Sequence, residues 1–104
     1  MRTKIKAILH TKDPESLIGQ SIEVAGWIRT IRDQKAFAFI ELNDGSTLAN
    51  LQVIADSSLP HYHQLILQLK AGASISIKGT IVESPGKNQK IEIKASFIHL
   101  YVLS

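Results

Sequence analysis

The sequence predicts an all-β domain in which five strands close into a barrel. Apolar and polar residues alternate over five segments, as they do in strands that bury one face. A single segment with helical spacing follows the third strand, and a glycine, Gly26, stands in the middle of the first. A bend or bulge at this glycine would let one long strand pair on two sides. Three strands, one helix and two strands is the order of the five-stranded OB barrel.

Residues 1–20 are expected to form a short helical lead-in to a barrel spanning residues 21–103. The first twelve residues carry Arg2, Lys4, Lys6 and Lys12 and no acidic residue. Asp13, Pro14 and Gly19 then bracket a short helical segment as its cap, its first-turn proline and its end.

The first three strands are predicted to form a meander over residues 21–55. Alternation in residues 21–32 places Ile22, Val24 and Ile28 on one face. Residues 36–43 alternate again, the pair Asp44-Gly45 marks a tight turn, and residues 48–55 form the third strand.

The helix and the last two strands follow. Ser58 is expected to cap the helix and Pro60 to start it, while the apolar residues at helical spacing are Tyr62, Leu65, Ile66 and Leu69. Residues 74–83 and 90–103 form the last strands, joined by the turn-rich loop 84–89. The apolar parity of the fifth strand switches near Phe97, which indicates a bulge or bend that helps to close the barrel.

The composition indicates one domain over residues 1–104, with no thiol chemistry. The chain has no Cys and a net charge of +3, and it contains no apolar run near the ~20 residues that span a bilayer. We therefore expect no membrane segment and an intracellular, cytoplasmic location. No Lys or Arg falls between Lys35 and Lys70, and this clustering of positive charge favours an anionic partner.

Strand parity also predicts which side chains face outward. In residues 36–43 the even positions are apolar (Ala36, Ala38, Ile40 and Leu42), so Phe37 and Phe39 share the outward face with Glu41 and Asn43. In the third strand the expected core positions are Ala49, Leu51, Val53 and Ala55, with Asn50 and Gln52 outside. In the fifth strand the outward set is Lys90, Glu92 and Lys94.

These outward residues combine rings, amides, a carboxylate and cations. Such a face is typical of proteins that stack and read single-stranded nucleic acid, and the flanking loops of an OB barrel add Arg32, Lys35, Lys87 and Lys90. Other interpretations stay open, because a loop could cover Phe37 and Phe39, and Arg29 and Arg32 could be ordinary surface charges. Trp27 is expected to pack at the barrel rim.

The motifs together resemble the N-terminal anticodon-binding domain of the class IIb aminoacyl-tRNA synthetases. The resemblance covers residues 21 to about 100 through VAGWIRTIRD (24–33), FAFIELNDGS (37–46), LQVIAD (51–56), SLP (58–60) and GTIVESPGKNQKIEIKAS (79–96). The Ser-Pro-Gly loop before the Ile-Glu-Ile strand favours the bacterial-type asparaginyl branch, with the aspartyl branch as the alternative.

The resemblance implies roles for individual residues. A strand 2 aromatic, here Phe39, would stack on the middle anticodon base, Gln52 would read its edge, and Glu92 would help to read a guanine in the first position. Arg32 matches an arginine expected to bind the anticodon loop. The full predicted tRNA site, for a G-U-U anticodon, is Phe39, Gln52, Glu92, Arg32, Arg29, Phe37, Lys35 and Lys87. Ile31 and the pair Lys35-Ala36 depart from the pattern of many relatives.

The resemblance also implies that these residues form only the recognition domain of an enzyme. The sequence shows none of the arginine-bearing motifs of a class II catalytic domain and no acidic cluster for magnesium. We therefore expect tRNA binding without catalysis or cofactor. ATP and Mg2+ would be used by a catalytic domain outside this sequence, in a parent enzyme that attaches asparagine to tRNA as a homodimer.

Three other functions remain as alternatives. A sequence-tolerant single-strand binder would use the same barrel and basic loops. A protein-interaction module could dock through Ile98, Leu100 and Val102. An enzyme is disfavoured, because no Cys, no Ser-His-Asp spacing and no paired carboxylates on one element are present. His61 and His63 do not share a helical face, so no metal site is expected.

Overall fold

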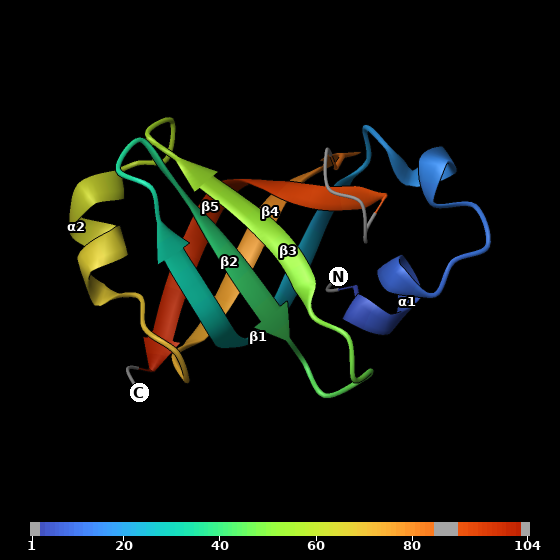
Figure 1. The fold of residues 1–104 in the computed structure, drawn as a ribbon, viewed down its shortest axis with the longest axis horizontal. Coiled ribbons are helices and arrows are strands. Elements are labelled where there is room, and N and C mark those ends of the chain that lie inside the picture. Colours follow the sequence, from blue (N-terminus) through green and yellow to red (C-terminus); the bar gives the residue numbers. More distant parts are fainter. Residues whose placement is uncertain (1–2, 85–89, 103–104) are drawn as a thin grey trace.

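The computed structural model describes residues 3–84 and 90–102, and in this part of the chain it confirms the closed five-stranded barrel (Figure 1). The strands follow the order β1-β2-β3-β5-β4, and β4 pairs with β1 to complete the ring. Their bounds are β1 Ser21–Asp33, β2 Phe37–Asn43, β3 Leu51–Asp56, β4 Ser74–Glu83 and β5 Ile91–Val102. The helices are α1 Ile5–Leu9, the 3-10 helix η1 Pro14–Leu17 and α2 Tyr62–Gln68.

Strand β1 pairs with two neighbouring strands, as predicted for a long first strand. It pairs with β4 over residues 21–27 and with β2 over residues 27–33. The expected irregularity lies later than Gly26, because the register with β2 shifts between Ile28 and Thr30 and leaves Arg29 as the extra residue. Gly26 is needed for another reason: a Cβ at this position would overlap the backbone carbonyl of Asn43.

The inward faces of β2 and β3 form the centre of the core. Six apolar side chains from these strands are fully buried: Ala38, Ile40, Leu42, Leu51, Val53 and Ala55. The prediction was wrong at Ala36 and Ala49, which are exposed because β2 begins at Phe37 and β3 at Leu51. Alternation therefore identified the inward face but placed both strand starts too early.

Strand β5 changes its inward face at a bulge, as the sequence predicts. Ile91, Ile93 and Ala95 are buried, and the next buried residue is Ile98. Opposite β4, Phe97 pairs with Lys78 and Ala95 with Gly79, so Ser96 is the inserted residue. The bulge leaves the Phe97 side chain 46% exposed.

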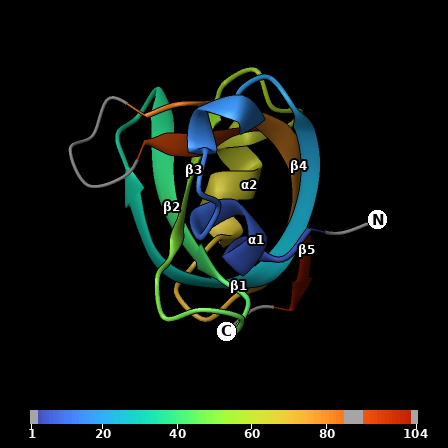
Figure 2. The ribbon, with the colours of Figure 1, turned by 90° about the vertical axis from the view of Figure 1, so that its right-hand side faces the viewer.

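The two ends of the barrel are closed by helices. Figure 2 looks along the barrel, with α1 in front of α2 inside the ring of strands. α2 buries Tyr62 and Ile66, and α1 buries Ile5 and Ile8. In the described part of the chain, no helix combines the length and the apolar character that a membrane crossing needs.

The predicted helical lead-in is confirmed, and the first turn of its helix α1 is bonded by a distant loop. The backbone N–H of Ile5 donates to Asp44 Oδ2 at 2.9 Å, and that of Lys6 donates to Ser46 Oγ at 3.0 Å. These side chains satisfy N–H groups that a helix start leaves without intrahelical partners. Residues 13–19 contain the predicted short helical segment as the 3-10 helix η1, with Pro14 in its first turn, but Asp13 makes no side-chain cap bond.

The hydrogen bonds that Asp44 accepts, including the one from helix α1, lower the pKa of its carboxyl. Partial burial acts to raise the pKa of the carboxyl, but hydrogen bonds from the Ser46 side chain and from the backbone N–H groups of Ile5 and Ser46 outweigh burial. The pKa of Asp44 therefore lies below its usual value, and the ionised form stabilises the fold.

The start of α2 differs from the prediction. His61 is the residue before the helix and adopts the left-handed conformation at φ 55°. Ser58 does not cap the helix, because its backbone N–H donates to Asp56 Oδ1 at 3.0 Å in a local turn at the end of β3. The apolar positions nevertheless match, since Tyr62, Ile66 and Leu69 are buried and Leu65 is half-buried.

Candidate functional site

The outward sides of β2, β3 and β5 form one continuous face, which we call the outer face. Cross-strand pairing places Phe39 beside Ile54 and Arg32, and Glu41 beside Gln52. The residues that define the outer face are Phe37, Phe39, Glu41, Gln52, Ile54, Glu92 and Lys94. Except for Ile54, which was not singled out, these positions were predicted by parity, and the prediction is confirmed because their inward neighbours are buried residues of the core.

An aromatic pair lies at one end of this face. The Phe37 and Phe39 rings are 5.1 Å apart between centroids at 84°, an edge-to-face contact. Both side chains are half-buried, and the Arg32 Cζ lies 5.2 Å from the centroid of the Phe39 ring. The arrangement can offer a stacking surface with a cation beside it.

A hydrogen-bonded amide and carboxylate lie farther across the same face. Gln52 Nε2 donates to Glu92 Oε1 at 3.1 Å, across the neighbouring strands β3 and β5. Glu92 is only 1% exposed, although its parity directs it away from the barrel interior. Parity thus gave the correct side for Glu92 but could not give its burial, which depends on contacts around the outer face.

A second amide and carboxylate pair lies beside the first. Asn50 Nδ2 donates to Glu41 Oε2 at 3.2 Å, and Asn43 Nδ2 donates to Asn50 Oδ1 at 2.9 Å. Asn43 is 7% exposed and also accepts the Gly45 N–H through its Oδ1 at 2.7 Å. Strand parity placed Asn43 on the outward face, but this prediction was wrong, because its side chain is buried in hydrogen bonds to the turn that follows β2.

The predicted cations fall into separate places. Arg32 is exposed beside Phe39, and Lys35 is exposed in the β1–β2 turn, where its backbone φ is 72° and its N–H donates to Asp33 Oδ1 at 2.9 Å. Arg29 lies apart from Phe39 in a groove that it shares with Trp27 and the loop of residues 45–48. Lys87 lies outside the described residues.

Trp27 lies at the rim of the barrel, as predicted. It is 37% exposed, and its indole is 3.6 Å from the position of a Cβ built on Gly45. The left-handed φ of 83° at Gly45 shapes the adjoining turn. The indole therefore packs against the turn that also carries Asp44 and Ser46.

An ion pair and a turn lie near the aromatic end of the outer face. The Ser58 hydroxyl and backbone N–H, followed by the charge of Lys94, hold the pKa of Asp56 below its usual value despite partial burial. Lys94 Nζ is 4.0 Å from Asp56 Oδ2, and the lysine is 56% exposed. Such a surface pair contributes little to stability.

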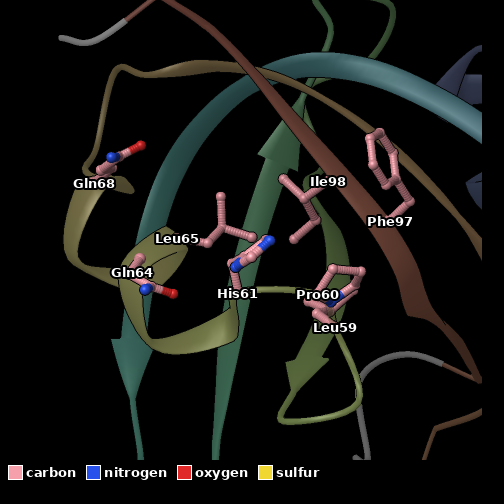
Figure 3. A pocket seen from close by; sticks show the side chains of 8 residues that line it. All are labelled: Leu59, Pro60, His61, Gln64, Leu65, Gln68, Phe97 and Ile98. Carbon is pink, nitrogen blue, oxygen red and sulfur yellow. The ribbon is translucent and has the colours of Figure 1, made fainter.

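A separate cavity of about 270 Å³ lies between α2 and β5 (Figure 3). It is lined by Leu59, Pro60, His61, Gln64, Leu65, Gln68, Phe97 and Ile98, none of which belongs to the predicted tRNA site. The predicted docking patch is not supported at its two described side chains, because Ile98 is buried and Leu100 is half-buried against the core. Within the described ranges, no three His, Cys, Asp or Glu side chains gather as a metal site.

Comparison with known proteins places these features in a family. The chain matches the family described as "OB-fold nucleic acid binding domain" over residues 22–101. It is 54% identical over 99 residues to the asparagine–tRNA ligase of Protochlamydia amoebophila, covering 94% of this chain and 21% of that relative. It is 50% identical over 101 residues to the asparagine–tRNA ligase of Microcystis aeruginosa, covering 97% and 21%.

The chain thus spans about one fifth of the length of these curated relatives. A solved structure, the asparaginyl-tRNA synthetase from Pyrococcus horikoshii, matches with a TM-score of 0.81 and 13% identity. That match covers 99% of this chain and 23% of the other, and it supports the fold.

Proposed function

Because this chain belongs to the family of OB-fold nucleic-acid-binding domains, we propose that it recognises the anticodon loop of a tRNA. The observation that carries the proposal is the outer face, where the Phe39 ring with Arg32 beside it shares a surface with the Gln52–Glu92 pair. Relatives at 54% and 50% identity are named asparagine–tRNA ligases, so the proposed anticodon is G-U-U.

The chemistry of the outer face fits the reading of unstacked bases. A base stacked on the Phe39 ring would gain about 1–3 kcal/mol without selection among bases. Selection then requires polar groups, and the Gln52 amide can both donate to and accept from a uracil edge. We assign Glu92 to the first base, where a carboxylate would accept from the N1 and N2 donors of guanine.

The remaining residues of the site would hold the RNA in place. Arg32, beside the Phe39 ring, and Lys35, exposed in the β1–β2 turn, could neutralise phosphates. Phe37 supports Phe39 through their edge-to-face contact. We assign Arg29 and Lys87 to peripheral phosphate contacts, with Arg29 acting from its own groove.

We further propose that residues 1–104 serve as the recognition domain of a cytoplasmic, homodimeric asparagine–tRNA ligase. The chain covers 21% of the relatives that carry this name. On this proposal, attachment of asparagine with ATP and Mg2+ belongs to the other four fifths. The domain described here would bind tRNA without a cofactor or metal of its own.

The test is a titration of the protein with a G-U-U anticodon stem-loop, using Phe39→Ala and Phe97→Ala as matched variants. Phe97 is an exposed phenylalanine on the β5 bulge, outside the outer face. Loss of a stacked ring should weaken binding about 5- to 150-fold for Phe39→Ala and leave Phe97→Ala near the wild type.

Chemical denaturation of the same samples separates loss of stacking from loss of fold. An unchanged affinity in a folded Phe39→Ala variant would overturn the proposal. Equal binding of any single strand, with affinity set only by length and salt, would favour a sequence-tolerant binder.

A further inference from the structure

The hydrogen bond between Gln52 and Glu92 joins two side chains to which the proposed function gives separate bases. We propose that Glu92 is also a positioning residue, which fixes the orientation of the Gln52 amide and so makes Gln52 select uracil over cytosine. This inference rests on the proposed function, since it concerns how the same face chooses the middle base.

The geometry favours a fixed contact. Gln52 Nε2 lies 3.1 Å from Glu92 Oε1, and the adjacent residues Val53 and Ile93 are direct partners in the parallel β3–β5 pairing. Both side chains therefore extend from the same row of neighbouring strands. In the free protein Glu92 is 1% exposed, so its contact with Gln52 is protected from competing water before a base binds.

The chemistry of a carboxylate allows one amide orientation only. An ionised carboxylate accepts hydrogen bonds and cannot donate them, so it must face the NH2 group of Gln52. A flipped amide would bring its oxygen against the carboxylate oxygen and lose the bond. The Gln52 Oε1 is thereby held away from Glu92 as an acceptor for a ligand.

A fixed acceptor distinguishes the two pyrimidines. Uracil presents an N3–H donor at the edge where cytosine presents an N3 acceptor, so only uracil can pair with the Gln52 oxygen there. The remaining N–H of the amide can meet the uracil O4, whereas the corresponding group of cytosine is a donor. Glu92 would thus act on the middle base through Gln52, without touching that base.

The chain supplies a matched control on the same face. Glu41 is also a carboxylate bonded to an amide, but its partner is Asn50, at 3.2 Å. Its Cα pairs with that of Gln52, so it lies next to the same amide, but its own hydrogen bond is to Asn50. Glu41→Gln removes the same charge as Glu92→Gln and leaves the Gln52–Glu92 contact in place.

The experiment measures the ratio of affinities for two stem-loops that differ only in U or C at the middle position. For the wild type and Glu41→Gln we expect the U loop to bind about tenfold more tightly. For Glu92→Gln we expect a ratio below about threefold, since an amide at position 92 can accept or donate and no longer fixes Gln52. Glu92→Asp keeps the charge but shortens the reach, and it should lower the ratio as well.

A second readout follows the amide itself. The side-chain 1H–15N resonances of Gln52, assigned by their loss in Gln52→Leu, should shift in Glu92→Gln and stay in place in Glu41→Gln. A shift together with a reduced ratio supports the proposal. A reduced ratio without a shift overturns it, because the effect would not pass through the amide.

The outcomes also separate this inference from the proposed function. A wild type that binds the G-U-U loop tightly and keeps its ratio in folded Glu92→Gln or Glu92→Asp overturns the positioning role alone. A wild type that does not distinguish the two loops overturns both. If Glu92→Gln does not fold, Glu92→Asp replaces it in the test. A reduced U-to-C affinity ratio together with shifted Gln52 resonances in Glu92→Asp would then support the proposal, and an unchanged ratio would overturn it.

Discussion

The two faces of β2 and β3 are made from the same strands but differ in what their side chains do. On the inward face, all six core residues from Ala38 to Ala55 are apolar and fully buried. On the outer face, Phe37, Phe39, Glu41 and Gln52 are only half-buried, and rings alternate with groups that donate and accept hydrogen bonds. The inward side chains therefore stabilise the fold by packing, whereas the outer face retains rings and hydrogen-bonding groups that a ligand can contact.

The largest expected effect is on the inward face. Ile40→Ala should lower the free energy of unfolding by about 3 kcal/mol, because it leaves a cavity in a fully buried site. Ile54→Ala makes the same chemical change on the outer face, where the side chain is half-buried, and should cost about 1 kcal/mol. Urea denaturation of both variants measures the difference, and equal losses would contradict the distinction between the faces.

The next effect concerns binding rather than stability. Arg32→Ala should weaken binding of the G-U-U stem-loop by about 1 kcal/mol and reduce the salt slope by about 1, since it removes one phosphate contact. Its effect on the U-to-C ratio should be small. Arg29→Ala removes the same charge in the groove beside Trp27 and should weaken binding less. Titrations at several salt concentrations test both variants. A larger loss for Arg29→Ala would contradict the account, because the RNA backbone would then lie closer to the groove beside Trp27 than to Phe39.

A third variant tests contacts that belong to neither face. Asp44→Asn should lower stability at neutral pH by about 1 kcal/mol, because the ionised carboxylate accepts from the first turn of α1. The folded pKa of Asp44 is lowered, so its contribution is present above the unfolded pKa of about 3.9 and is lost as the pH falls through the folded value.

The pH dependence supplies the check on Asp44. Denaturation from pH 7 to pH 2 should show that Asp44→Asn loses less stability across the acid range than the wild type. Curves that run parallel over this range would mean that Asp44 carries no ionisation-linked stability.

The smallest effect separates stability from binding at one residue. Lys35 has a φ of 72°, which glycine adopts without strain, so Lys35→Gly should raise the unfolding free energy by about 0.5–1 kcal/mol. Lys35→Ala keeps the strain and should not. Both remove the charge and should weaken RNA binding alike. A stability gain in Lys35→Ala would show that charge, rather than backbone strain, governs this turn.

Much of the barrel could be predicted because alternation reports local burial directly. The core positions of β2 and β3 and the switch in β5 follow from a period of two with one inserted residue. The bulge at Arg29 was not predicted, although Ile31 packs against the core with the opposite parity to Ile28 and so records the shift of register.

Within the predicted helical lead-in, the bounds of helix α1 could not be predicted, for a physical reason. Its five residues are too short to show a helical period, and the groups that bond its first turn, Asp44 and Ser46, lie about forty residues away in the sequence. Its buried Ile5 and Ile8 are recognisable only once the barrel end that they close is known.

The candidate site was predictable in its residue types and less so in their surroundings. Parity and resemblance together selected Phe39, Gln52 and Glu92, and the structure brings Gln52 and Glu92 into contact. Neither source indicated that the Glu92 side chain is nearly inaccessible to solvent. Neither indicated that the Asn43 amide donates a hydrogen bond to Asn50. Both features depend on contacts between residues of different strands, and a single sequence does not show which residues lie opposite one another.

The most direct test of the central claim, that the outer face reads bases, is the affinity of the wild-type protein for G-U-U and G-C-U stem-loops at two salt concentrations. If Gln52 reads the middle base, the U loop should bind about tenfold more tightly, about 1.4 kcal/mol, and this gap should survive added salt. Equal affinities that fall together as salt rises would contradict the claim and leave only charge attraction by the basic loops.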